Sequence, residues 1–182
     1  MFTKQHTKSR LIAGTALFSA LVAAVEYLSL AVPILRIPFP LNPILKFDMA
    51  EIPAALSYFV FGLPVGVATS LLVPLTIIAR GTTNPVGAWI KGFAVLSTVV
   101  GFAPFAKRNK FLAAFTAIIS RVLVMTLANI AMFGTDLWVL LLSGVFNLIH
   151  TVLTIGGATI LFEAIVLRIP QLRLKEKLLN KT

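Results

Sequence analysis

The sequence predicts an all-α integral membrane protein, a bundle of six transmembrane helices with a long outer first loop and both termini in the cytoplasm. The 182 residues are 58% hydrophobic and 12% charged, and the mean hydropathy is +0.97. Soluble domains contain about 45–50% apolar and 25% charged residues. Apolar stretches recur along the chain, and Lys and Arg gather on alternate connections between them. We therefore treat residues 1–182 as a single transmembrane domain.

The apolar stretches set the number of spans. They cover approximately residues 11–32, 50–62, 64–79, 86–104, 111–133 and 137–167. The second and third are near or below the roughly 20 residues that cross a bilayer as a helix. Their separation near Gly62 and Pro64 rests on turn-forming residues alone. A five-span arrangement is the alternative.

The basic residues predict the orientation. With six spans, one side of the membrane collects eleven of the sixteen, namely Lys4, Lys8, Arg10, Lys107, Arg108, Lys110, Arg168, Arg173, Lys175, Lys177 and Lys181. The connections on the other side hold Arg36, Lys46 and Arg80. Cytoplasmic loops carry an excess of Lys and Arg. We therefore expect the basic N-terminus (1–10) and the basic tail (168–182) to be cytoplasmic.

The long loop over residues 33–50 is then outside. Proline fixes its own backbone and disfavours helix at the preceding residue, and this loop contains Pro33, Pro38, Pro40 and Pro43. We expect it to be extended and stiff. Because the loop is also apolar, it is either a lid packed on the helices or a segment lying among lipid headgroups.

The first span carries a stripe of small residues. Ala16, Ala20 and Ala24 recur every four residues and share one helix face, where small side chains let a second helix approach closely. The stripe predicts a docking surface for another protein. Packing within the chain's own bundle is the alternative.

Composition also excludes several classes of site. The chain has no cysteine and two histidines, so neither a thiolate nucleophile nor a metal centre is expected. The net charge of +10 is distributed as in membrane proteins, which favours a membrane surface over nucleic acid as its partner.

Five segments together resemble a known family. They are "ALFSAL" at 16–21, "LKFDMAEIPAAL" at 45–56, "TTNPVGAWIKGF" at 82–93, "MTLAN" at 125–129 and "FNLIH" at 146–150. In this order they resemble landmarks of the substrate-binding S component of energy-coupling factor (ECF) transporters, and in particular its riboflavin-specific branch. The resemblance extends from residue 11 to about residue 167.

The resemblance implies a non-enzymatic protein in the cell membrane that captures riboflavin outside the cell and needs no cofactor of its own. It implies a transmembrane coupling subunit and two cytoplasmic ATPases as partners, with the alanine stripe facing the coupling subunit. The chain contains no G-x-x-x-x-G-K-[ST] phosphate loop, so we expect ATP hydrolysis to belong to those partners.

Polar residues inside the spans predict the ligand site, because they are costly in lipid and should face a cavity or the bundle interior. Asn147 and His150 share one face of the last span, and Thr126 and Asn129 share one face of the fifth. An Asn amide offers both a donor and an acceptor to a heteroaromatic ring, and Asn147 matches the family's "FNLI" position. Interhelical hydrogen bonds are the alternative role for these side chains.

Two departures from the riboflavin pattern leave the ligand open. Val145 and His150 stand where "PFNLIK" usually has proline and lysine, and Lys91 stands where "PVGPLAN" has asparagine. Lys91 either replaces the missing cation, contacts an anionic group of the ligand, or extends to the outer headgroups. Flavin mononucleotide (FMN) or another vitamin-like ring compound is the alternative ligand.

The charged segment before the second span predicts a helix cap. Asp48 would cap the helix and Glu51 would close a capping box, with Pro53 in the first turn. Direct contacts from Lys46 and Asp48 to the ligand are the alternative.

The remaining charges within spans suggest either an ion pair or a proton relay. Glu26 and Arg121 would relieve each other's cost if they met, whereas a relay would need further carboxylates one turn away. An unrelated secondary transporter would show inverted repeats or paired broken helices, and a membrane enzyme would show a convergent catalytic set. We find neither signature in the sequence.

Overall fold

The computed structural model describes residues 2–81, 83–106 and 108–168. This part of the chain forms six helices and one β-hairpin, with helices α1 (Phe2–Leu28), α2 (Glu51–Phe61), α3 (Leu63–Arg80), α4 (Pro85–Phe102), α5 (Lys110–Phe133) and α6 (Leu137–Arg168). Five of them are long and apolar enough to cross a membrane. Helix α2 has 11 residues and is therefore about 16 Å long, shorter than a bilayer core. The six-helix prediction is confirmed, with α2 as a short helix.

The helix boundaries follow from local chemistry. Gly62 separates α2 from α3 with φ 92°, and Gly81 ends α3 with φ 74°, values that a residue with a Cβ rarely adopts. The side chain of Asn84 caps α4 by accepting from the backbone N–H of Gly87 at 2.6 Å. Asn109 caps α5 in the same way. The predicted break between the second and third stretches therefore lies at Gly62.

The outer loop forms a hairpin. After a short 3₁₀ turn at Pro33–Leu35, strand β1 (Arg36–Phe39) pairs antiparallel with strand β2 (Asn42–Asp48). The register places Arg36 opposite Asp48, and it shifts between Pro38 and Phe39. Proline is tolerated on such an edge strand or at a bulge. The extended conformation predicted for this loop is confirmed.

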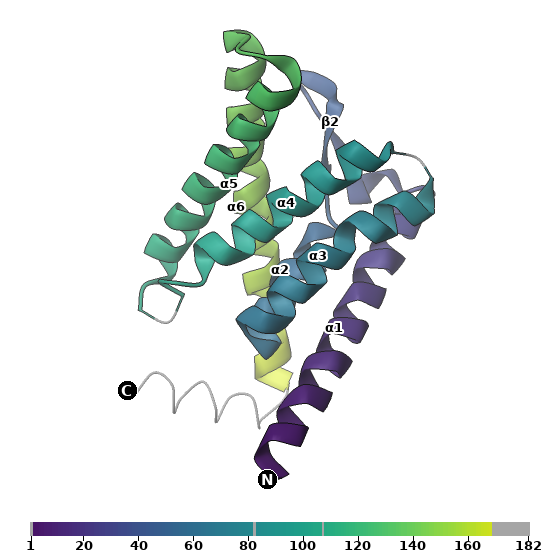
Figure 1. Cartoon of the computed structure of the whole chain (residues 1–182), viewed down its shortest axis with the longest axis vertical. Coiled ribbons are helices and arrows are strands. Elements are labelled where there is room, and N and C mark those ends of the chain that lie inside the picture. The colour runs from purple at the N-terminus through teal and green to yellow at the C-terminus, as the bar shows by residue number, and fades with distance from the viewer. Residues whose placement is uncertain (1, 82, 107, 169–182) are drawn as a thin grey trace.

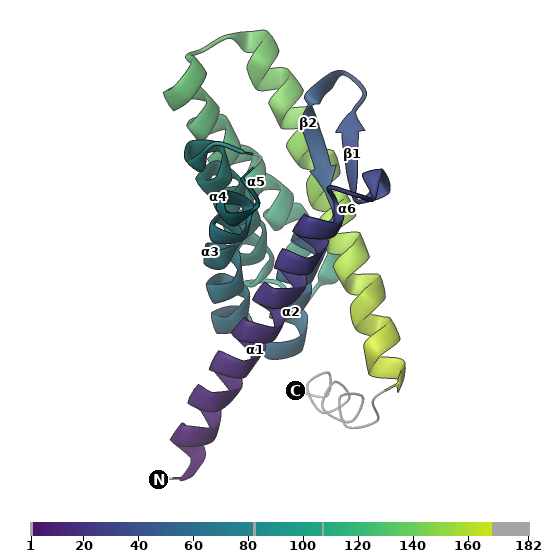
Figure 2. The same ribbon diagram turned by 90° about the vertical axis from the view of Figure 1, so that its right-hand side faces the viewer.

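The hairpin lies at one end of the molecule, and the start of α1 and the end of α6 lie at the other. Figures 1 and 2 show β1 and β2 beside the upper part of α6, whereas α1 begins and α6 ends at the other end. The cytoplasmic location of the termini stays a prediction. The predicted basic tail beyond Arg168, and Lys107, lie outside the described residues.

Helix α1 has two different faces. Phe18, Val22 and Glu26 are buried against the bundle, with Phe18 against the ring of Phe61 in α2 and Glu26 paired with Arg80 of α3. Because two residues turn a helix by about 200°, the alanine stripe lies on the opposite face, and its three residues, Ala16, Ala20 and Ala24, are all exposed. Within the described part of the chain, the alanine stripe therefore does not pack into the bundle.

Helices α3 and α4 approach each other closely. A Cβ placed on Gly92 of α4 would lie 2.3 Å from Cγ of Pro74 in α3. Both residues are buried. This contact fixes the position of α4, and with it the position of Lys91.

Candidate ligand site at the base of the hairpin

Two clusters of charged and polar side chains, most of them buried, lie where the hairpin joins the helices. We call the first the Arg121 cluster; its members are Glu51, Arg121, Asn147 and His150. We call the second the hairpin-base cluster; its members are Glu26, Arg36, Asp48, Arg80 and Lys91. Such groups are costly in a membrane-embedded bundle unless they are paired.

The Arg121 cluster joins α2, α5 and α6. The Arg121 guanidinium donates to both carboxylate oxygens of Glu51, at 2.5 and 3.2 Å, which is the bidentate geometry of a strong pair. Its Nε donates to Oδ1 of Asn147 at 3.0 Å. Its Nη2 lies 3.1 Å from Nδ1 of His150. Each of these side chains is nearly fully buried, so they hold one another in fixed orientations.

The hairpin-base cluster is a chain of alternating charges. The Arg80 guanidinium contacts the Glu26 carboxylate, whose Oε1 accepts from Nζ of Lys91 at 2.9 Å. Lys91 also contacts Oδ2 of Asp48, and the same oxygen lies 3.7 Å from Nε of Arg36. Helices α1, α3 and α4 are thereby tied to the hairpin.

Asp48 connects the two clusters. Its backbone N–H donates to Nε2 of His150 at 3.2 Å, and its side chain contacts Lys91. Burial alone would raise the pKa of Asp48, but the Lys91 ammonium and the backbone N–H of Ala50 hold that pKa below its ordinary value. Asp48 is therefore held in its charged form at neutral pH.

Aromatic rings cover the Arg121 cluster on the hairpin side. Phe47 of β2 stacks on Phe146 of α6 with ring centroids 5.0 Å apart, and Phe39 of β1 lies 5.6 Å from both. Phe47 also meets the His150 ring edge-on at 5.6 Å. The hairpin is thus packed on α6, as a lid would be.

The structure brings four of the predicted ligand residues together, namely Asn147, His150, Lys91 and Asp48. Asn129 is linked to them through Ser143, whose hydroxyl accepts from the amide groups of Asn129 at 2.6 Å and Asn147 at 3.2 Å. Thr126 is half-buried and Lys46 is exposed. Within the described part of the chain, no hydrogen bond joins either of these two to the clusters. Ligand binding by all seven residues stays a prediction.

The capping-box prediction is wrong. Ala50 is the residue that precedes α2, and no side chain caps that helix end. The Asp48 carboxylate accepts from the N–H of Ala50 at 3.0 Å, within its own turn, and Glu51 pairs with Arg121 instead. A buried cation 70 positions away competes better for the Glu51 carboxylate than an N–H of its own helix.

The suggested pairing of Glu26 with Arg121 is also wrong, because each has other partners in the two clusters. The sequence did not predict Glu51, Arg121, Glu26 or Arg80 as site residues. Their only signal in the sequence was a lone charge within or beside an apolar span. A lone charge does not indicate which residue it pairs with, because the partners come from helices that are distant in sequence.

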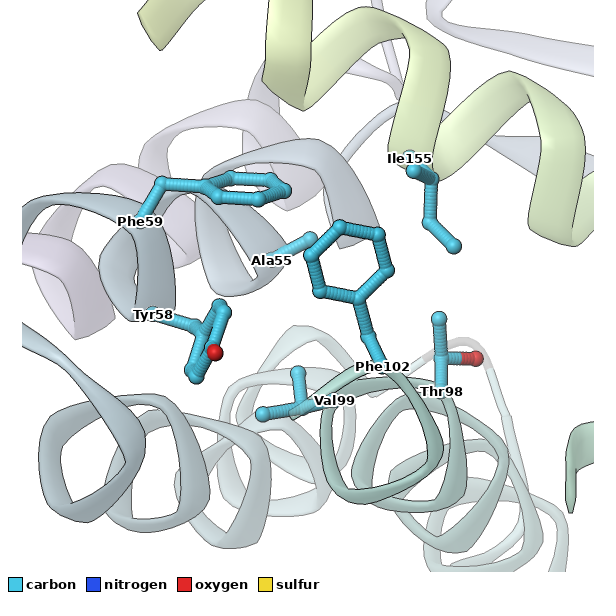
Figure 3. A pocket seen from close by; sticks show the side chains of 7 residues that line it. All are labelled: Ala55, Tyr58, Phe59, Thr98, Val99, Phe102 and Ile155. Atoms are coloured by element: carbon cyan, nitrogen blue, oxygen red, sulfur yellow. The ribbon is translucent and has the colours of Figure 1, made fainter. Parts of the chain in front are cut away.

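A small cavity lies deeper in the bundle, between α2, α4 and α6 (Figure 3). Its volume is about 10 Å³ and its lining is mostly apolar, with Tyr58, Phe59 and Phe102 contributing rings. This is space for about one water molecule. Among the described residues, no group of three or more His, Asp or Glu side chains is arranged to hold a metal ion.

No protein-family model and no curated protein sequence matches the chain. A solved structure does match, the one described as "Structure and mechanism of the S component of a bacterial ECF transporter". The two chains are 17% identical, with a TM-score of 0.66, and the match covers 91% of this chain and 98% of the other. At this identity the similarity concerns the fold. The chain therefore has the multi-pass helical membrane fold of an ECF transporter S component.

Proposed function

We propose that this protein is an S component that captures riboflavin outside the cell and delivers it through an ECF transporter driven by partner ATPases. It would take no part in chemistry itself. FMN or another small vitamin-like ring compound is the alternative ligand. The proposal rests on the fold together with the groups gathered beneath the hairpin.

The observation that carries the proposal is the meeting of Asn147 and Arg121 with the stacked rings of Phe47 and Phe146. Flat ring ligands are bound by apolar and aromatic walls with a few fixed polar groups. Arg121 donates to the Asn147 carbonyl oxygen, and the carbonyl and hydroxyl oxygens of Ser143 accept from the Asn147 NH2 group. The amide is therefore held in one orientation, and a ring ligand would share or replace these partners, which costs little rotamer freedom. The imide edge of a flavin ring has the complementary groups.

The environment of Lys91 favours riboflavin over FMN. Its ammonium already contacts the carboxylates of Glu26 and Asp48. Both charges would have to be displaced before Lys91 could serve a ligand phosphate. A neutral ligand makes no such demand.

The exposed alanine stripe of α1 supports docking to a coupling subunit. Small side chains at i, i+4 and i+8 let helices approach closely in lipid, and these three are not used by the bundle. We propose that the stripe meets the transmembrane coupling subunit and that two cytoplasmic ATPases complete the transporter.

The experiment that tests the ligand is a fluorescence titration of riboflavin with the detergent-purified chain alone. We expect saturable quenching for the wild type and for Asn109→Ala, which changes an exposed cap of α5. We expect quenching to be lost in Asn147→Ala, because the amide that would face the ring is removed.

Equal quenching by wild type and Asn147→Ala would reject the site. Absence of quenching by the wild type would reject riboflavin, and thermal-shift assays with FMN and other vitamins would then identify which ring compound the fold carries.

A further inference from the structure

Arg80 is the most enclosed cation of the hairpin-base cluster. Its side chain is 0% exposed. Only Nη1 of its guanidinium has partners: the Glu26 carboxylate, the Ser29 hydroxyl at 3.2 Å and the Glu26 carbonyl at 3.4 Å. Nε and Nη2 are buried, and neither has a hydrogen-bond partner among the residues that the structure describes. A buried donor without a partner is unfavourable, and more so when it is charged.

The two unpaired atoms form one edge of the guanidinium. Nε and Nη2 point their N–H groups in parallel, which is the geometry that receives two oxygens of a carboxylate or phosphate. Glu26 does not occupy this edge, because its contact is with Nη1. Arg80 therefore presents a complete bidentate donor pair.

The charges of the cluster lead to the same conclusion independently. Three cations, from Arg36, Arg80 and Lys91, face two carboxylates, from Glu26 and Asp48. In the neighbouring cluster Arg121 is balanced by Glu51. The cluster thus has one cation more than it has carboxylates. The Arg36 and Lys91 side chains are 23% and 19% exposed, whereas the Arg80 side chain is 0% exposed, so a single anion held at Arg80 would neutralise the excess where water screens it least.

We propose that the free edge of Arg80 binds one oxyanion, a phosphate or carboxylate group, at the hairpin end of helices α1 and α3. The site is separate from the Arg121 cluster and does not depend on riboflavin being the ligand. The same oxyanion chemistry is offered by inorganic phosphate, by a lipid headgroup and by a phosphorylated ligand.

Paired probes distinguish these sources. The delipidated, detergent-purified full chain is melted with phosphate against chloride at equal ionic strength. It is also melted with a short-chain phosphatidylglycerol against the matching diacylglycerol, and with FMN against riboflavin. A group that binds only the folded state raises the melting temperature in a saturable way. The proposal predicts such a rise for the phosphate-bearing member of at least one pair.

The variant that isolates the edge is Arg80→Lys. Lysine keeps the positive charge and can still contact Glu26, but it lacks the second pair of parallel donors. We expect the affinity for the stabilising probe to fall by roughly tenfold or more, as for the loss of a hydrogen bond between charged groups. Arg168→Lys makes the same replacement at an exposed position and should leave the affinity unchanged.

Three results would overturn the proposal. They are equal melting temperatures within all three probe pairs for the wild type, unchanged affinity in Arg80→Lys, and an equal loss in Arg168→Lys. The first comparison needs no variant, so the proposal remains falsifiable even if Arg80→Lys does not fold. A response to the lipid pair alone assigns the site to a headgroup, and a response to the flavin pair alone assigns it to the transported ligand.

Discussion

Arg121 and Glu51 form a buried ion pair with two hydrogen bonds in the candidate ligand site, and their side chains are 2% and 1% exposed. Removal of one partner leaves an uncompensated charge in the bundle, which typically costs about 3–5 kcal/mol. We predict that Arg121→Met lowers the free energy of unfolding in detergent by about this amount. Denaturant unfolding followed by circular dichroism measures it.

Two further variants serve as controls for that prediction. The double variant Glu51→Gln/Arg121→Met removes both charges and should recover part of the loss. Glu163→Gln breaks an exposed ion pair, in which the Glu163 side chain is 59% and the Lys110 side chain 66% exposed. It should change the free energy of unfolding by less than about 0.5 kcal/mol. If Arg121→Met were as stable as the wild type, the ion pair of the Arg121 cluster would not stabilise the fold as described.

The contribution of Asp48 to the free energy of unfolding should depend on pH. The pKa of Asp48 in the folded chain lies below its ordinary value of 3.8. Its stabilising effect is therefore fully present above pH 3.8 and is lost as the pH falls through the lower, folded-state pKa. We expect the stability difference between wild type and Asp48→Asn to be constant near neutral pH and to shrink below pH 3.8. A difference that grows on acidification would contradict this.

At the scale of the element, the two faces of α1 separate folding from docking. Leucine at Ala20 leaves the buried face untouched, but it blocks the close approach of another helix. We predict that Ala20→Leu reduces riboflavin uptake to background in cells that also contain the coupling subunit and ATPases, while riboflavin binding by the purified chain is unchanged. Ala131→Leu, at an exposed alanine of α5, is the matched control. Loss of riboflavin binding by Ala20→Leu, or unchanged uptake in cells with this variant, would contradict the proposal that the alanine stripe docks to the coupling subunit.

The contact between α3 and α4 gives a second prediction for an element. A methyl group on Gly92 collides with Pro74, and such overpacking costs about 1–3 kcal/mol. Gly92→Ala should therefore destabilise the chain. Gly144→Ala in α6 meets nothing within 4 Å and should stabilise it by roughly 0.5–1 kcal/mol. If both variants raised the melting temperature, or both lowered it, the packing described for α4 would be contradicted.

The elements were largely predictable from the sequence. Apolar stretches and Gly62 predict the helices because lipid admits few other spanning structures. Prolines predict that residues 33–50 are extended. They do not predict the pairing of Arg36 with Asp48, which depends on the geometry of the turn and on the packing of Phe47 against Phe146. Partners such as Arg121 and Glu51 depend on how six helices pack, and spacing along the chain carries no information about that.

At the scale of the whole molecule, the hairpin closes one end of the bundle and the described chain ends lie at the other (Figure 1). The ion-pair chain from Arg80 to Asp48 ties α1, α3 and α4 to that hairpin. Release of the hairpin would therefore disturb the packing of three helices at once. This arrangement suits a protein that encloses a small ligand at one end.

We propose that the chain holds a flavin beneath the hairpin without help from its partners. Mass spectrometry of the small molecules that co-purify with wild type, Asn147→Ala and Asn109→Ala tests it most directly. We predict riboflavin at close to one molecule per chain in the wild type and in Asn109→Ala, and none in Asn147→Ala. A different compound retained by the wild type, no retained compound in any of the three, or equal riboflavin in all three would contradict it.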